Sequence, residues 1–215
     1  MDINKNINET ITRAEHFLRD LKRNFENDND INHAVMNAIF AMEELGRLPL
    51  LSAKMYGNEI SSWKEFKSEN ISEADKNHIE KLCNYLFLFN FIYPNYSEIF
   101  SEKKEIAKDE KQLMQLIKKE SKEILIKMFN PQFRKNIIDQ ARLLHQRRMQ
   151  GQYEDQGTNL KEEHIKQYLN QLEKHIKLTK QLGDLNNINP ELFKNEFFNS
   201  IDKEKIKKEI LKNKN

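Results

Sequence analysis

Residues 38–51 read AIFAMEELGRLPLL, and this stretch decides the fold class. It continues a pattern in which apolar side chains recur three and four positions apart. The members of the pattern are Ile31, Ala34, Val35, Ala38, Ile39, Met42, Leu45 and Leu48. Such spacing puts them on one face of an α-helix, where they can pack against a core. Pro49 lacks a backbone N–H and clashes with the preceding turn, so we expect the helix to kink or end there.

The same helical spacing continues on both sides of this segment, and no alternation typical of strands is present. The sequence NDND at 27–30 predicts a loop that supplies an N-cap for the helix described above. Before it, an apolar stripe from Ile3 to Phe25 predicts a first helix. After it, one helix begins at the capping pair Ser72 and Asp75 and stops at Pro94, and a charged helix follows over 98–129. Two more helices are predicted, one from Pro131 to near Gly151 and one over 161–182. A short turn carries Trp63. We therefore predict an all-α bundle of five to six helices over residues 1–183, followed by a C-terminal helical extension or tail over residues 184–215.

Composition supports a helical protein of the cytoplasm. The 215 residues include 33% charged side chains but only five glycines and four prolines, which favours long helices. The formal net charge is +2, so any basic surface for nucleic acid has to be local. Cys83 is the single cysteine, which excludes an internal disulfide and suits a reducing compartment. The sequence shows no signal peptide and no apolar stretch of membrane-spanning length, so we expect no membrane association.

The first polar motif is the pair Glu43 and Glu44, which interrupts an otherwise apolar helix. Arg47 lies four positions after Glu43 and three after Glu44, so it can pair with either acid. One interpretation is a surface ion pair. The other is partial burial of an acid, which normally requires a cationic partner.

Two further motifs carry possible chemistry. His78 and Lys81 share one helical face, although a solvated face would show the same spacing. Arg142, His145, Arg147 and Arg148 then gather at a helix end, shortly before Tyr153. Guanidinium groups bind phosphate oxygens bidentately, so this cluster suits phosphate binding. The alternative is that these cations satisfy the carbonyls and dipole of the helix C-terminus.

Other kinds of site fit the sequence poorly. It contains no glycine-rich phosphate loop, no CxxC pair and no Glu-x-x-His pairs of the di-iron bundle type. We therefore predict no cofactor and no metal. His164 and His175 lie on one helix without acids in a metal-binding arrangement, and we expect both to be exposed. Cys83 belongs to an apolar stripe and is expected in the core.

Taken in order, these motifs resemble the AbiV family of phage abortive-infection proteins, which belongs to the HEPN group. The resemblance rests on Glu43-Glu44-Leu45-Gly46-Arg47, on Trp63, on His78 with Lys81, and on Arg147-Arg148 followed by Tyr153-Glu154-Asp155. It covers roughly residues 10–180. It implies a HEPN-like helical bundle that works as a homodimer and arrests growth or translation in infected cells.

Many HEPN proteins are metal-independent ribonucleases that use an arginine followed at a short spacing by a histidine. This sequence departs from that pattern, because Tyr153 follows Arg147 and Arg148 where the histidine is expected. As catalytic candidates the resemblance implies Arg147, Arg148, Tyr153, Glu43, Glu44, His78 and His145. As phosphate-binding candidates it implies Arg47, Lys81 and Arg142. Two hypotheses stay open: a toxin that cleaves RNA, or a non-catalytic protein that binds RNA, the translation machinery or a phage-encoded activator.

Overall fold

The computed structural model describes residues 3–48, 72–92, 130–153 and 161–183, together with positions 108, 109, 112 and 115. Its helices are α1 (Ile3–Glu26), α2 (Ile31–Leu45), α4 (Glu73–Phe87), the π-helical turn η2 (Leu88–Ile92), α8 (Pro131–Tyr153) and α9 (Glu162–Gly183). Every regular element within these ranges is helical, which confirms the all-α class. Most of the predicted helix over 98–129, the Trp63 turn and the tail after 183 lie outside the described residues.

The first two helices form a hairpin with the predicted loop between them. Asp30 caps α2, since its carboxylate accepts a hydrogen bond from the backbone N–H of His33 at 3.0 Å. Asn29 has a φ of 50°, a left-handed conformation that asparagine tolerates better than most residues. The NDND segment therefore acts as the turn and the N-cap that its composition predicts.

The start of α4 is also as predicted. The Ser72 hydroxyl oxygen accepts from the Asp75 N–H at 3.1 Å and donates to Asp75 Oδ2 at 2.6 Å. After Phe87 the helix continues as the π-helical turn η2, which the apolar spacing does not predict. Pro94, the expected stop, lies outside the described residues.

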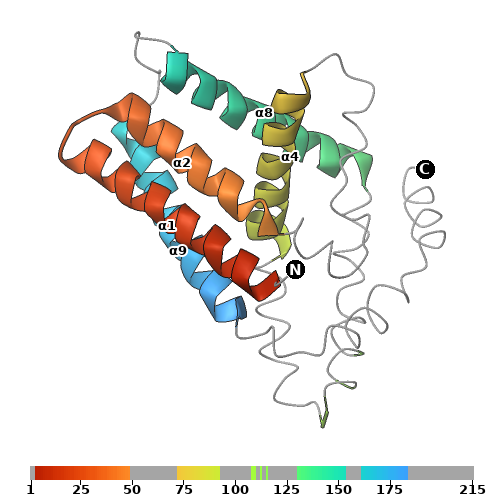
Figure 1. The fold of residues 1–215 in the computed structure, drawn as a ribbon. Coiled ribbons are helices and arrows are strands. Elements are labelled where there is room, and N and C mark those ends of the chain that lie inside the picture. The colour runs from red at the N-terminus through yellow and green to blue at the C-terminus, as the bar shows by residue number, and fades with distance from the viewer. Residues whose placement is uncertain are drawn as a thin grey trace.

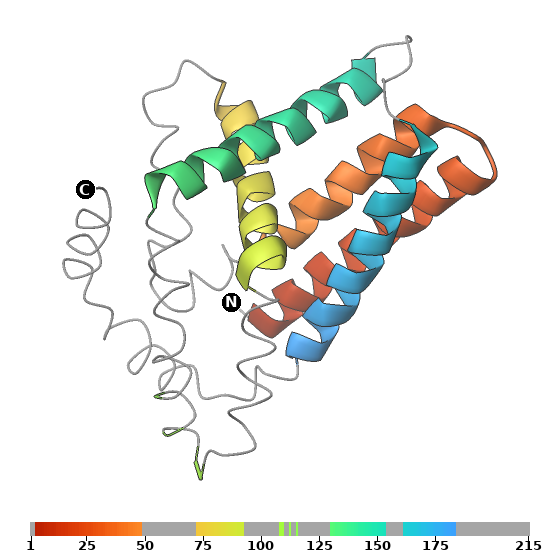
Figure 2. The ribbon, with the colours of Figure 1, turned by 180° about the vertical axis from the view of Figure 1, so that it is seen from behind.

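The helices pack around one core. Helices α1, α2 and α9 lie side by side, and α8 crosses both α2 and α4 (Figures 1 and 2). The two views agree that α4 stands at a steep angle to the α1–α2 hairpin. The fully buried apolar side chains include Ala14, Leu21, Ala38, Ile39, Leu45, Leu82, Cys83, Ile165 and Leu172. Cys83 is thus a core residue, as expected.

Two glycines allow other helices to approach α2 closely. Gly46, at the end of α2, faces the backbone carbonyl of Lys81 on α4, and an added methyl group would overlap that oxygen. Gly151 on α8 faces the backbone carbonyl of Asn32, where an added Cβ would lie at 3.0 Å. Gly46 has a φ of −67°, so the need there is for space and not for an unusual backbone conformation.

Two helix ends differ from the sequence-based expectation. Helix α2 ends at Leu45, before Pro49, at the point where Gly46 meets α4. Helix α8 continues past Gly151 to Tyr153, because Gly151 serves close packing inside the helix and does not cap it.

Candidate functional site

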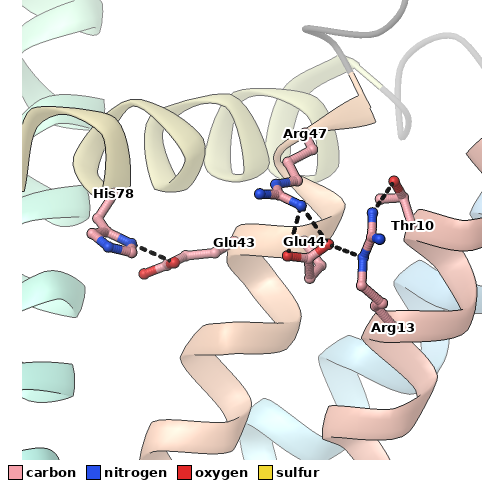
Figure 3. Close-up of polar contacts among 6 residues, drawn as sticks. All are labelled: Thr10, Arg13, Glu43, Glu44, Arg47 and His78. Carbon is pink, nitrogen blue, oxygen red and sulfur yellow. Dashed lines mark hydrogen bonds and ion pairs between the residues drawn. The ribbon is translucent and has the colours of Figure 1, made fainter. Parts of the chain in front are cut away.

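The centre of the candidate site is Glu43, whose side chain is only 6% exposed. Its Oε2 lies 2.7 Å from Nδ1 of His78 on α4. Figure 3 shows the two side chains pointing toward each other. Its Oε1 lies 3.7 Å from Nε of Arg148 on α8, which is an ion pair but too long for a hydrogen bond. One buried carboxylate therefore joins three helices. The surface ion pair considered for this acid is wrong, because Glu43 turns into the bundle.

The contact with Glu43 defines which ring nitrogen of His78 carries a proton. A carboxylate accepts hydrogen bonds, so Nδ1 of His78 carries a proton and donates it to Glu43. In the neutral ring Nε2 then holds the lone pair. Nε2 has no hydrogen-bond partner among the described residues, and the His78 side chain is 28% exposed. A base oriented by a buried acid, with its second nitrogen free, is an arrangement suited to proton transfer.

A second carboxylate–imidazole pair lies beside the first. Nε2 of His145 on α8 lies 3.0 Å from Oδ1 of Asp75 on α4. The rings of His78 and His145 stack, with centroids 5.8 Å apart and planes inclined by 13°. Burial lowers the pKa of His145, against the opposing effect of Asp75. The hydrogen bond from Ser72, followed by that from His145, lowers the pKa of Asp75.

Arg148 is enclosed by the bundle. Its side chain is 11% exposed, and its guanidinium carbon lies 5.1 Å from the ring centroid of Phe40. That distance is within the range of a cation–π contact. Arg148 therefore meets an acid and an aromatic face, both on α2.

Glu44 belongs to a separate cluster on the other side of α2. Figure 3 shows Arg13 of α1 and Arg47 converging on its carboxylate. Arg13 Nε donates to Oε2 at 2.8 Å, and Arg47 lies 3.2 Å from Oε1. Of the two acids that Arg47 could reach, it pairs with Glu44. These contacts tie α1 to the end of α2.

Lys81 lies between the two clusters and is half-buried. Burial and then the charge of Arg47 lower its pKa, against the opposing charges of Glu43 and Glu44. Within the described ranges Lys81 forms no ion pair and no hydrogen bond through its side chain. It is a cation one helical turn from His78 that is available to an anion.

The remaining candidates lie elsewhere. Arg147 donates to the Tyr168 hydroxyl on α9 at 2.6 Å, pointing away from its neighbour Arg148. Arg142 lies 3.9 Å from Asp139 on its own helix. Tyr153 ends α8, and its side chain lies outside the described residues.

His175 corrects an expectation, because it is buried and not exposed. Its Nδ1 lies 2.8 Å from the Tyr85 hydroxyl, and its ring stacks on Phe89 at 4.4 Å. Burial lowers the pKa of His175 to about 4 and raises that of Tyr85. The tyrosine therefore keeps its proton and donates it to a neutral imidazole. His164 is half-exposed.

Sequence reasoning missed two residues at this site. The sequence predicts Asp75 only as part of a helix cap, and nothing local indicates that its second oxygen reaches α8. The sequence indicates Gly46 only as part of the motif Glu43-Glu44-Leu45-Gly46-Arg47.

An all-helical bundle that gathers histidine, arginine and carboxylate side chains between its helices fits the HEPN class of protein. A family model of HEPN type, described as AbiV, matches residues 2–184. The chain therefore belongs to the AbiV family, and this membership suggests a part in abortive infection, a defence against phage. Curated proteins and solved structures gave no significant match. Among the described helices none has the length and apolar character needed to cross a membrane.

Proposed function

We propose that the chain is a cytoplasmic abortive-infection effector that cleaves RNA without a metal ion, with His78 as the general base. The observation that carries this proposal is the His78–Glu43 pair. A buried carboxylate holds one ring nitrogen at 2.7 Å, and the other nitrogen has no hydrogen-bond partner among the described residues. Histidine held in this way removes protons efficiently near neutral pH.

The reaction uses the ribose 2′-hydroxyl as nucleophile. His78 Nε2 takes the hydroxyl proton, and the 2′-oxygen forms a bond to phosphorus. The bond from phosphorus to the 5′-oxygen breaks, and that oxygen takes a proton from a general acid. The products are a 2′,3′-cyclic phosphate and a 5′-hydroxyl end. Lys81 and Arg47 stabilise the charge that builds up on the phosphate oxygens.

The other candidates have supporting roles in this proposal. Glu43 orients His78, and Arg148 balances the buried charge of Glu43. Tyr153 ends α8 two residues after Gly151, which packs at the start of α2 and therefore far from His78, so in this proposal a water molecule donates the proton to the leaving oxygen. The family relationship favours a homodimer, in which a second copy contributes to one RNA-binding surface. The bundle of residues 1–183 carries the site, and the extension over 184–215 is a separate unit.

A second function is favoured by the burial of Arg148 and His145. Both side chains are 11% exposed, which leaves little room for direct contact with an RNA phosphate. If they serve only to hold three helices together, the same surface would act by binding. The target would be RNA, the translation machinery or a phage-encoded activator.

Sequencing of RNA 5′ ends from expressing cells, with and without phage, separates these functions. The informative variant is His78→Asn, because its amide can still donate to Glu43 but has no equivalent of Nε2. His16→Asn is the matched control, since His16 is an exposed histidine on α1. Discrete cuts with 5′-hydroxyl ends that vanish only in His78→Asn support cleavage. Growth arrest with intact RNA in every strain refutes cleavage and supports binding.

A further inference from the structure

Two carboxylate–imidazole pairs lie next to each other where α2, α4 and α8 meet. In one pair, Glu43 holds Nδ1 of His78; in the other, Asp75 holds Nε2 of His145. The two rings are nearly parallel, with planes inclined by 13° and centroids 5.8 Å apart. The second pair is not needed for the chemistry proposed above, so its role is a separate question.

The contacts of His145 define its tautomer. Its Nδ1 is buried and has no hydrogen-bond partner among the described residues. A proton there would be an unpaired buried donor, which is more costly than a bare lone pair. The proton therefore lies on Nε2, where Asp75 accepts it. His145 is also surrounded by groups with opposite effects, Arg148 and Glu43, and burial keeps its ring neutral.

We propose that Asp75 is a positioning residue that acts on His78 through His145. The carboxylate fixes the tautomer and plane of the His145 ring, and that ring fixes the plane of His78 against Glu43. A neutral His145 also adds no positive charge of its own beside His78 when His78 accepts a proton. This inference rests on the proposed function, because it names a residue that orients His78, the proposed general base of that same site.

The structure allows this role to be separated from helix capping. Asp75 uses Oδ2 and its N–H for Ser72, and Oδ1 for His145. Ser72→Ala removes the capping contacts and leaves the contact with His145. Asp75→Asn has nearly the same shape but loses the charge that holds the Nε2 proton. The two variants thus form a matched pair.

The test is nitrogen-15 and proton NMR of the histidine rings in the full chain, combined with RNA cleavage kinetics. In Asp75→Asn we expect His145 to lose its single Nε2–H tautomer and the ring protons of His78 to shift. We expect kcat to fall about tenfold, while KM stays within about twofold of the wild-type value. This fall in kcat is smaller than the one expected for removing a carboxylate that contacts the base directly. Ser72→Ala should lower thermal stability and leave the tautomer, the His78 resonances and kcat as in the wild type.

Equal effects of Asp75→Asn and Ser72→Ala, or no effect of Asp75→Asn on either ring, would overturn the proposal. If Asp75→Asn does not fold, His145→Gln is the second variant, and it should shift the His78 ring protons in the same way. If the wild type cleaves no RNA, the proposed function fails. The NMR comparison would still decide whether Asp75 orients the two rings.

Discussion

Replacing Gly46 by alanine tests the close crossing of α2 and α4 on which the site depends. A methyl group at this position would overlap the carbonyl oxygen of Lys81, and Cβ atoms essentially never approach closer than 3.0 Å. Because the obstacle is backbone, it cannot rotate away, so the helices have to move apart by roughly 1 Å.

A displacement of that size is enough to break the site. Glu43 lies three residues before Gly46, and its contact with His78 is 2.7 Å. A shift of roughly 1 Å stretches this contact beyond hydrogen-bond range. Overpacking costs about 1–3 kcal/mol, and a buried acid that loses a partner adds to it. We expect Gly46→Ala to lower the free energy of unfolding by roughly 3 kcal/mol.

Urea unfolding followed by circular dichroism measures this difference, and Gly151→Ala is the control. The added Cβ at Gly151 would lie at 3.0 Å from the Asn32 oxygen, a contact that a small adjustment relieves. Alanine also favours the interior of α8 by about 1 kcal/mol over glycine. We therefore expect Gly151→Ala to stay within about 1 kcal/mol of the wild type. If Gly46→Ala is as stable as Gly151→Ala, the helices do not cross as closely as described.

Three other perturbations probe the buried charges and the free cation. The pKa of His175 in the folded chain is about 4, below its ordinary value of 6.5, so the unfolded chain binds the extra proton and stability falls as the pH drops from 6.5 towards 4. The loss is at most about 3 kcal/mol, and urea titrations at several pH values should show a flatter profile for His175→Gln. Glu43→Gln should lower the free energy of unfolding by roughly 2–4 kcal/mol, because it breaks a buried ion pair. Glu44→Gln, in a more solvated cluster, should lower it by about 1 kcal/mol or less. Equal losses in the two variants would contradict the burial of Glu43. Lys81→Met should weaken RNA binding, measured by fluorescence anisotropy, and should reduce the salt dependence of the binding constant by about one ion. Lys81→Arg, which keeps the charge, and Lys135→Ala, at an exposed lysine, should bind RNA like the wild type.

The sequence is most informative for features that depend on residues close together along the chain. Helical spacing of apolar side chains predicts α1, α2, α4, α8 and α9, because each of these helices buries one continuous face. The caps at Asp30 and Ser72 follow from local hydrogen bonds. The π-helical turn after Phe87 does not follow from this spacing, since such a turn depends on packing.

Polar residues of the site could be selected from the sequence, but their partners could not. Consecutive helical residues point about 100° apart, so Glu43 and Glu44 face different helices, as do Arg147 and Arg148. Local spacing cannot tell which neighbour turns inward. The same limit explains why the sequence predicts His175 at the surface, although Tyr85 and Phe89 of distant segments enclose it.

The sequence by itself thus determined the helices α1, α2, α4, α8 and α9, the caps of α2 and α4, and the short set of polar side chains, because those features arise within one or two turns of chain. The tertiary structure alone decided that Glu43, His78, His145 and Arg148 form one cluster and that Asp75 joins it. The physical reason is that these contacts cross between α2, α4 and α8. The crossing depends on the space left by Gly46 and Gly151, which no local pattern encodes.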